Sequence, residues 1–372
     1  MGIKGLNKFL KEFAPGSIKT VELSNFYGKV VAIDTSIYMY RGFYFEKIST
    51  SDIGKNVSPV APFIRQIVRF VKNGIIPLYV FDGKPPKEKA NELKGRKNAK
   101  ESNMKTIDNL NVIKSKFLAG ESDFHKKYST ITDVEMDLQK YNKRVLNVKK
   151  HNFDQVMELF RLMGIPYIVA VGEAEGLCAK LVKDGTAIAT LSEDTDLYPC
   201  GCPLVIKDFS PTNNTVTQTD LRVALHELGL TYDQFIDLCI LLGSDYHRNT
   251  IRGIGPKKAY EYIKKFGDIE GIIENTKHTV PDNFNYVKIR ELFKHCGEEN
   301  LVDESYIPKF SFPVIKKILC YLKDNEIKIS KAYIKYLEND YIQTIKKIME
   351  NKKSELQLSK EKKISDFFNS KK

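Results

Sequence analysis

Short apolar runs rich in β-branched residues alternate along the chain with segments of helical periodicity. The predicted strands cover residues 30–33, 75–81, 165–171, 187–191 and 204–206. Between them, apolar side chains recur three or four positions apart in residues 59–73, 151–163 and 173–184. Runs of the first kind predict buried strands, and spacing of the second kind predicts amphipathic helices. Their alternation predicts an α/β fold with a mostly parallel central sheet flanked by helices.

The second half of the chain is predicted to be helical. Three apolar-periodic segments, at residues 220–228, 232–242 and 257–266, are separated by Gly229 and by residues 243–256. The last 25 or so residues are rich in Lys and Ser, which predicts a flexible tail of roughly that length. No apolar run approaches the ~20 residues of a membrane span. Because the N-terminus also lacks the apolar stretch of a signal peptide, we expect a soluble intracellular protein.

The six cysteines show no metal-binding or disulfide pattern. Only Cys200 and Cys202 lie close in sequence, and no second pair follows at zinc-finger spacing. In a reducing compartment we therefore expect six free thiols.

The net charge of +12 is concentrated in one segment. Residues 84–150 contain 17 Lys and Arg but only 9 Asp and Glu. Such a concentration is typical of a surface that binds a polyanion. A solvated, partly disordered loop would have the same composition.

Acidic residues follow nearly every predicted core strand. Asp34 and Asp82 directly follow the first two strands, and Glu173 comes two residues after the third. Asp194 and Asp196 follow the fourth. Ligands of parallel sheets bind where the carboxyl ends of the strands meet. A polar loop explains any one of these acids, but it does not predict an acid at the end of almost every strand.

Seven carboxylates are predicted to meet at this edge, because Glu175 lies two positions after Glu173 and Asp245 follows the apolar segment 232–242. Repulsion and burial would raise their pKa values. Divalent cations relieve this conflict, and two ions ~3.5–4 Å apart suit in-line attack on a phosphodiester. We predict two Mg²⁺ ions, for which Mn²⁺ can substitute. For Asp245 the alternative is a helix cap.

Two basic features accompany the acids. Lys89 and Arg96 are seven residues apart, so they share one face of a helix that the preceding prolines favour. A cation there can hold the scissile phosphate; a solvent-facing pair is the alternative. The turn Gly253-Ile-Gly255-Pro256 precedes a helix, so its backbone N–H groups can face a phosphate. An ordinary turn between helices has the same residues.

These motifs together resemble the flap endonuclease family. The matching segments are MGIKGL (1–6), VAID (31–34), VFDGKPP (80–86), GEAE (172–175), EDTD (193–196), DLCILLGSDY (237–246) and RGIGPK (252–257). They occur in the family order from residue 1 to roughly 275.

The resemblance implies a structure-specific 5′ flap endonuclease that cleaves branched DNA near the flap junction in replication and repair. It implies Mg-dependent hydrolysis giving 5′-phosphates, with a 5′→3′ exonuclease side activity. All seven acids match metal ligands of the family. By analogy Asp34, Asp82, Glu173 and Glu175 hold one ion, and Asp194, Asp196 and Asp245 hold the other, although bridging ligands can be shared. Lys89 and Arg96 match the basic pair of the family's gateway helix.

The resemblance also implies DNA contacts. Tyr40 matches an aromatic residue that stacks on a base, with burial in the core as the alternative, and Lys47 matches a basic contact. Gly2, after removal of Met1, is expected near the active site, where Glu173 and Asp245 also approach DNA. The helix–two-turn–helix DNA-binding element, which binds a monovalent cation (K⁺ here), would use Gly243, Gly253, Gly255 and Lys257.

The tail resembles a sliding-clamp motif, in which Ile364, Phe367 and Phe368 fill an apolar pocket of the clamp. Glu361 replaces the family's glutamine, which puts the affinity for the clamp in question. The implied partners are branched DNA and the sliding clamp, with no membrane and a monomeric chain. Localisation would be nuclear in a eukaryote and otherwise intracellular.

The predicted organisation has five parts. They are an N-terminal nuclease region (1–100), a basic helical arch (84–145), an internal nuclease region with the helix–two-turn–helix (146–275), a C-terminal helical region (276–355) and the tail (356–372). The interval between Asp82 and Glu173 is longer than the family pattern, which predicts an insertion within residues 101–135 of the arch. Three alternatives stay open: a sister 5′→3′ exonuclease, an inactive clamp-bound DNA adaptor and an RNA-directed relative.

Overall fold

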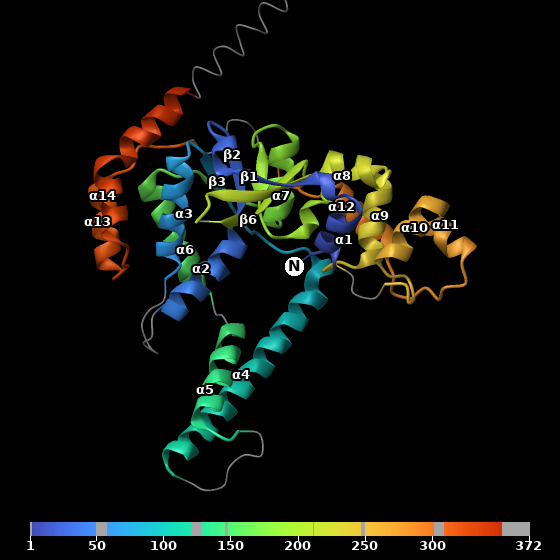
Figure 1. Cartoon of the computed structure of the whole chain (residues 1–372), viewed down its shortest axis with the longest axis horizontal. Coiled ribbons are helices and arrows are strands. Elements are labelled where there is room, and N and C mark those ends of the chain that lie inside the picture. Colours follow the sequence, from blue (N-terminus) through green and yellow to red (C-terminus); the bar gives the residue numbers. More distant parts are fainter. Residues whose placement is uncertain are drawn as a thin grey trace, which may run out of the picture.

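A seven-stranded sheet forms the centre of the molecule (Figure 1). The structure is a computed structural model that describes residues 2–49, 58–120, 128–145, 148–210, 212–246, 250–300 and 309–351. The sheet order is β1-β7-β6-β5-β2-β3-β4. The strands are β1 (Ile18–Glu22), β2 (Val30–Asp34), β3 (Ile76–Phe81), β4 (Tyr167–Val169), β5 (Ala189–Leu191), β6 (Leu204–Ser210) and β7 (Thr215–Asp220).

The predicted mostly parallel sheet is confirmed. β4, β3, β2, β5 and β6 pair in parallel, and they correspond to the five runs in the sequence. β7 pairs antiparallel with β6 and with β1, which forms one edge of the sheet. These last two strands were not predicted, because Ile-Lys-Thr-Val-Glu and Thr-Val-Thr-Gln-Thr-Asp are short and mostly polar. The carboxyl ends of the parallel strands thus share one edge.

Helices cover both faces of the sheet because the strands are apolar on both sides. Ala32, Leu78 and Val80 point into one core, whereas Val31, Ile33 and Tyr79 point into the other. The first core contains α1 (Leu6–Phe13), α7 (Ala174–Lys183), α8 (Leu221–Leu228), α9 (Tyr232–Leu242), α10 (Pro256–Phe266), α11 (Ile269–Asn275) and α12 (Tyr286–Lys294). The second contains α2 (Thr35–Ser49), α3 (Val60–Lys72), α6 (Lys150–Met163), α13 (Ile315–Asp324) and α14 (Lys331–Asn339).

Local signals fix the helix ends near the site. α9 begins after Thr231, whose hydroxyl accepts from Gln234 N while the Gln234 side chain accepts from Thr231 N. This capping box satisfies two N–H groups that the helix itself leaves unpaired. α7 begins at Ala174, one residue later than the predicted segment 173–184, its N-cap is Glu173, and the Glu173 side chain makes no capping hydrogen bond. That carboxylate is therefore available to the site.

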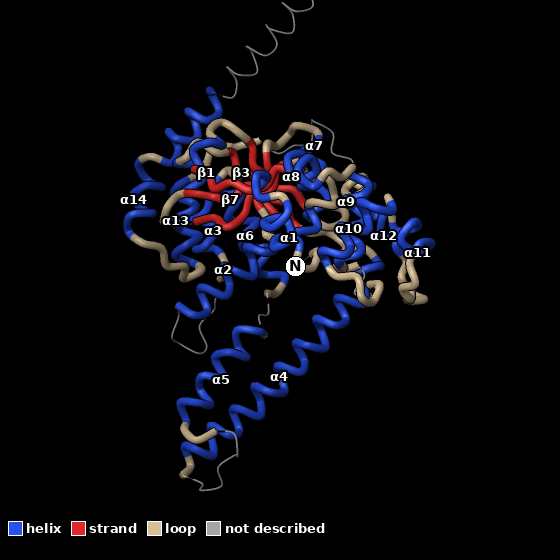
Figure 2. The backbone as a smooth tube through the Cα atoms, turned by 45° about the vertical axis from the view of Figure 1, so that its right-hand side comes forward, coloured by secondary structure: helices blue, strands red, loops and turns tan. Residues whose placement is uncertain are grey.

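The basic arch is a helical hairpin that projects from the body (Figures 1 and 2). α4 (Ala90–Leu118) passes through Gly95 without interruption, and α5 (Ile131–Arg144) returns beside it. The hairpin has its own small core, formed by Leu110, Tyr128, Val134 and Leu138. The predicted insertion, residues 101–135, spans the far part of this hairpin.

Strands from residues 1–100 and 146–275 contribute to the one sheet, so the predicted nuclease regions share a core. Among the described residues no helix combines the length and apolarity needed to cross a membrane. The expectation of six free thiols is wrong for two of them, because Cys200 and Cys296 form a disulfide. The fold brings the turn that follows β5 and η4 next to the segment after α12, so these two cysteines meet. The other four cysteines are free.

Candidate active site

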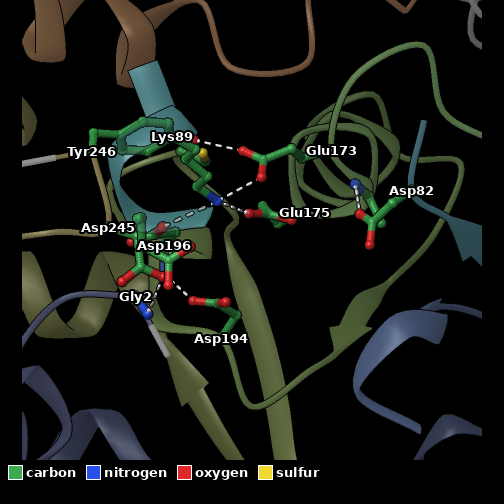
Figure 3. Close-up of polar contacts among 12 residues, drawn as sticks. Gly2, Asp82, Lys89, Glu173, Glu175, Asp194, Asp196, Asp245 and Tyr246 are labelled. Atoms are coloured by element: carbon green, nitrogen blue, oxygen red, sulfur yellow. Dashed lines mark hydrogen bonds and ion pairs between the residues drawn. The ribbon is translucent and has the colours of Figure 1, made fainter. Parts of the chain in front are cut away.

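The seven predicted carboxylates come from segments that meet at the carboxyl edge of the sheet, and Figure 3 labels all of them except Asp34. Asp34 ends β2, and Asp82 follows β3. Glu173 and Glu175 lie at the start of α7. Asp194 caps the short 3₁₀ helix η4 (Thr195–Leu197), which contains Asp196, and Asp245 follows α9. Parallel topology therefore brings together acids that are up to 211 positions apart in the chain, from Asp34 to Asp245.

The ammonium group of Lys89 lies among these acids (Figure 3). Its Nζ is 2.7 Å from Glu173 Oε1, 2.9 Å from Glu175 Oε1 and 3.9 Å from Asp196 Oδ2. Burial would lower the pKa of Lys89, but Glu175 and its other acidic neighbours raise it well above the usual value. The lysine therefore stays charged and neutralises part of the cluster.

Arg96 reaches the other side of the cluster from the next turns of α4. Its Nη2 lies 3.3 Å from Asp245 Oδ2, and its Nε is paired with Glu92. The predicted sharing of one helix face by Lys89 and Arg96 thus places both at the acids, although α4 itself begins only at Ala90. Arg96 remains half exposed, whereas Lys89 is buried.

The N-terminus closes the site beside Asp245. Gly2 N donates to Asp245 Oδ2 at 3.4 Å, and Lys4 N donates to the carbonyl of Gly243 at 2.9 Å. Gly2 has a φ of 81°, and a Cβ there would lie 2.3 Å from Asp194 Oδ1. Only glycine fits this position, in agreement with its expected place near the active site.

Three groups that the sequence did not single out hold two of the acids. Ser192 Oγ donates to Asp34 Oδ2 at 2.8 Å, and Ser36 Oγ donates to Asp82 Oδ2. The backbone N–H of Ala174 donates to Asp82 Oδ1 at 2.8 Å. The last contact sets the carboxylate at the positive end of α7. Each serine lies two positions from an acid, a local signal too common to be read alone.

Tyr246 holds both a carboxylate and the lysine. Its hydroxyl donates to Glu173 Oε2 at 3.0 Å, and its ring centre lies 4.9 Å from Lys89 Nζ. The ring packs edge-on against Phe293 of α12. Tyr246 is the last residue of the family segment 237–246, but its contacts with Glu173 and Lys89 depend on the fold.

Burial raises the pKa values of most of these carboxyl groups, so it opposes full ionisation of the cluster. It raises the pKa of Glu173 to about 7 and that of Asp194 to about 6, with Glu175 adding to both shifts. Burial also raises the pKa values of Asp34, Asp82 and Asp196, again with help from acidic neighbours. A folded chain therefore retains protons here that an unfolded chain would release.

Asp196 provides the test of whether the residues fit a metal. It has no exposed surface, and neither of its carboxylate oxygens accepts a hydrogen bond. Buried carboxylate oxygens without a donor need a cation. Among the described residues, no group of three or more His, Cys, Asp or Glu side chains is positioned to hold a metal ion in the present arrangement. Lys89 supplies the positive charge instead, and the all-oxygen donor set fits Mg²⁺ or Mn²⁺.

Of the predicted DNA contacts, Gly2, Glu173 and Asp245 belong to this cluster, whereas Tyr40, Gly253, Gly255 and Lys257 are not part of it. Tyr40 of α2 is 46% exposed, so it is not a core residue. Lys47 is also on α2, but its side chain lies outside the described residues. Gly253 has a φ of 80° in the turn before α10, and Gly255 is the N-cap of that helix. Lys257 Nζ pairs with Glu12 at 2.8 Å.

The predicted clamp motif, with Glu361, Ile364, Phe367 and Phe368, lies outside the described residues. It therefore stays a prediction.

Comparisons with known proteins agree with the geometry. Residues 1–103 match the model of the XPG N-terminal domain, and residues 164–245 match that of the XPG I-region. Flap endonuclease 1 from Aedes aegypti is 40% identical over 304 residues, which cover 79% of this chain and 75% of the relative. Flap endonuclease 1 from Entamoeba histolytica is 36% identical over 329 residues, covering 83% and 82%.

Solved structures show the same fold. The catalytic core of Rad2 in complex with DNA substrate has a TM-score of 0.64 at 22% identity, covering 90% of this chain and 100% of that chain. Flap endonuclease-1 from Methanococcus jannaschii has a TM-score of 0.61 at 24% identity, covering 92% and 99%.

Proposed function

This chain belongs to the flap endonuclease family, and we propose on this basis that it cleaves branched DNA at the base of a 5′ flap. The single observation that carries this proposal is the gathering of seven carboxylates around Lys89, with Asp196 buried and without a hydrogen-bond donor. A scaffold or adaptor has no use for so much repulsion, because burial and neighbouring acids disfavour the charged forms of five of these carboxylates, Asp34, Asp82, Glu173, Asp194 and Asp196.

The residues that would hold two Mg²⁺ or Mn²⁺ ions are the seven acids. By family analogy, the group from β2, β3 and α7 serves one ion, and Asp194, Asp196 and Asp245 serve the other. Bound divalent ions supply an activated water and charge stabilisation for a phosphodiester displacement.

The basic residues of α4 prepare the substrate. Lys89 and Arg96 lie on two sides of the acids, so they can draw one phosphate of the DNA between them and the carboxylates. Lys89 then exchanges carboxylate contacts for contacts with the phosphate, where developing negative charge strengthens them. Tyr246 keeps the lysine and Glu173 in place during this exchange. Hydrolysis in this orientation leaves a 5′-phosphate on the product.

The surrounding elements select the branched form of DNA. The α4–α5 hairpin projects from the body (Figure 1), and the excess of Lys and Arg in residues 84–150 suits a single 5′ strand passing beneath it. Duplex DNA would contact the turn before α10 through Gly253, Gly255 and Lys257, with K⁺ at the same turn. Tyr40 would stack on a base near the cut, and Lys47 would contact the backbone.

Further properties follow from the family. We propose that the chain acts as a monomer and that Ile364, Phe367 and Phe368 bind a sliding clamp with an affinity set partly by Glu361. In a eukaryote the protein would act in the nucleus, and in another host it would act within the cell, in DNA replication and repair.

A cleavage assay tests the proposal. End-labelled 5′-flap, nicked, gapped and single-stranded DNA are incubated with the chain in Mg²⁺, in Mn²⁺ and in Ca²⁺. We expect one flap-length product from the 5′-flap substrate in Mg²⁺ or Mn²⁺, and binding without cleavage in Ca²⁺. A ladder of mononucleotides would instead identify the sister exonuclease, and binding without any cleavage would identify the adaptor. A further substrate with an RNA flap strand tests the third alternative, because preferred cleavage of the RNA flap would identify the RNA-directed relative.

A further inference from the structure

We propose that Cys200 and Cys296 form a reversible redox pair, a modification site that adjusts the metal affinity of the carboxylate cluster. The proposal rests on the proposed function in that it assumes that the acids bind divalent ions inside a cell. The two cysteines are 96 positions apart, and their Cα atoms lie 5.4 Å from each other.

Cys200 is attached to one group of ligands. It lies four residues after Asp196, and its backbone N–H donates to the Asp196 carbonyl at 3.1 Å. The same turn is closed by Cys202 N, which donates to Leu197 O at 3.0 Å. Any displacement of Cys200 is therefore transmitted to the segment that carries Asp194 and Asp196.

Cys296 is attached to the other group. The next residue, Gly297, packs against Gly176, the neighbour of Glu175 in α7. A Cβ on Gly297 would lie 2.2 Å from the Gly176 carbonyl oxygen, so the two backbones have no free space between them. The disulfide thus joins a segment behind Asp196 to a segment behind Glu175.

A small thiol reductant can approach this bond from one side. Cys200 is fully buried, whereas Cys296 is partly exposed and lines a cavity of about 550 Å³. Glu173 and Glu175 line the same cavity. Access is a main determinant of the rate of thiol–disulfide exchange, so Cys296 Sγ is the sulfur that would be attacked.

The neighbouring thiols do not compete for the pair. Burial raises the pKa of Cys202 to about 11 and raises the pKa values of Cys178 and Cys239, so all three stay protonated and unreactive. Cys320 is exposed but belongs to α13, on the opposite face of the sheet. Disulfides of intracellular proteins are usually transient or redox-sensing rather than structural.

The exchange is a two-electron reduction by a dithiol. A thiolate of the dithiol attacks Cys296 Sγ, the disulfide bond breaks, and Cys200 leaves and takes up a proton. The second thiol of the reductant then displaces Cys296 from the mixed disulfide, so two protein thiols and one oxidised cyclic disulfide result. The freed sulfurs must separate to van der Waals distance. Because the Gly176–Gly297 contact cannot compress, the turn that carries Asp196 shifts relative to Glu175.

The test measures Mn²⁺ affinity in both redox states of the full chain. Oxidised and reduced protein are freed of reagent, and Mn²⁺ binding is followed by electron paramagnetic resonance. Alkylation and peptide mass spectrometry report the state of each cysteine. We expect a peptide linked through Cys200 and Cys296 in the oxidised sample only, and a Mn²⁺ affinity about 10-fold weaker after reduction, as for loss of other supporting contacts around metal ligands.

Two variants complete the experiment. Cys296→Ser should match the reduced protein under all conditions, and Cys320→Ser, the control, should respond like the natural chain. If Cys296→Ser does not fold, the reduced natural chain gives the same comparison. Absence of the linked peptide, or equal Mn²⁺ affinity in the two states, would overturn the proposal. Cleavage of a 5′-flap at saturating Mn²⁺ is scored separately, so an affinity shift without cleavage would refute the proposed function alone.

Discussion

The two ends of α4 are built in opposite ways. At its base, Lys89 is buried and in contact with acids from two other segments, and Arg96 extends the same contacts to Asp245. Towards its far end, the described part of the helix packs against α5 around a core of four buried side chains, and Lys114 pairs with Glu135. The base is fixed by contacts to several segments of the body, whereas the described far end packs against its own hairpin partner.

This difference separates two tasks. Groups that act on a phosphate need fixed positions, because an error of about 1 Å costs much of the rate. A segment that a DNA end must pass needs a low cost of local opening, and such segments have few buried apolar contacts. We therefore expect changes at the base to affect chemistry, and changes at the far end to affect substrate entry.

The largest effect is expected for Asp196→Asn. The amide removes a charge that has no hydrogen-bond donor, so the metal-free chain should unfold at a higher temperature than the natural one. Loss of several kcal/mol of transition-state stabilisation should slow flap cleavage about 10³-fold. Thermal denaturation and single-turnover cleavage measure both effects. Asp184→Asn, at the exposed end of α7, is the control, and a lower unfolding temperature for Asp196→Asn would contradict the account.

The next effect concerns Lys89. Replacement by Gln keeps the length of the side chain but removes the charge that faces Glu173 and Glu175. Single-turnover cleavage should fall about 10²- to 10³-fold, as for loss of one preorganised donor. Lys97→Gln, on the exposed surface of the same helix, should leave the rate within a factor of about two, the scale of an exposed charge. Equal losses in both variants would show that charge on α4, and not its placement, is what counts.

Two features of the base could be predicted from the sequence. The acids followed from the strands, because the carboxyl ends of parallel strands meet whatever the loops do. Lys89 and Arg96 followed from helical spacing. The insertion of the Lys89 ammonium between Glu173 and Glu175 could not be predicted, since it depends on how α4 leaves the body.

Contacts between single residues that are far apart in the chain could not be predicted from the sequence either. Ser36 and Ser192 are isolated serines with no periodic pattern, and Cys200 meets Cys296 only because the fold brings the segment after η4 to the segment after α12. β1 and β7 were missed because their polar alternation is weak and their partners are supplied by the fold. Local periodicity therefore predicted individual helices and strands, whereas no single segment of the sequence shows which distant residue or strand it will contact.

A smaller effect is expected at the far end of α4. Leu138→Ala removes one of the four buried side chains of the hairpin and should destabilise it locally by about 2–5 kcal/mol. Met136→Ala changes the same helix at a side chain that is 64% exposed, and it should have little effect. Hydrogen exchange of the hairpin amides should increase only in Leu138→Ala. Cleavage of a long 5′-flap should decline more than cleavage at a nick, and an equal decline in both would contradict a role in substrate entry.

The smallest effect is a pH dependence of the metal-free chain. The pKa values of Glu173 and Asp194 are raised to about 7 and about 6, so the folded state binds these protons more tightly than the unfolded state. That contribution favours folding below the folded pKa values and is lost as the pH rises through them. Because divalent ions bind the ionised acids, the gain in unfolding temperature on adding Mg²⁺ should be larger at about pH 8 than at about pH 5. A gain independent of pH would contradict the assignment.

The most direct test compares binding and cleavage of one 5′-flap substrate by the Asp194→Asn and Asp245→Asn variants. Both carboxylates belong to the proposed ligands of the second ion, and neither lies in a strand of the sheet or in the apolar core of the hairpin. At saturating Mg²⁺ the account predicts that both variants bind the flap with measurable affinity and have lost cleavage. Unchanged turnover in either variant would contradict the claim that these acids hold the metal ions that cut DNA.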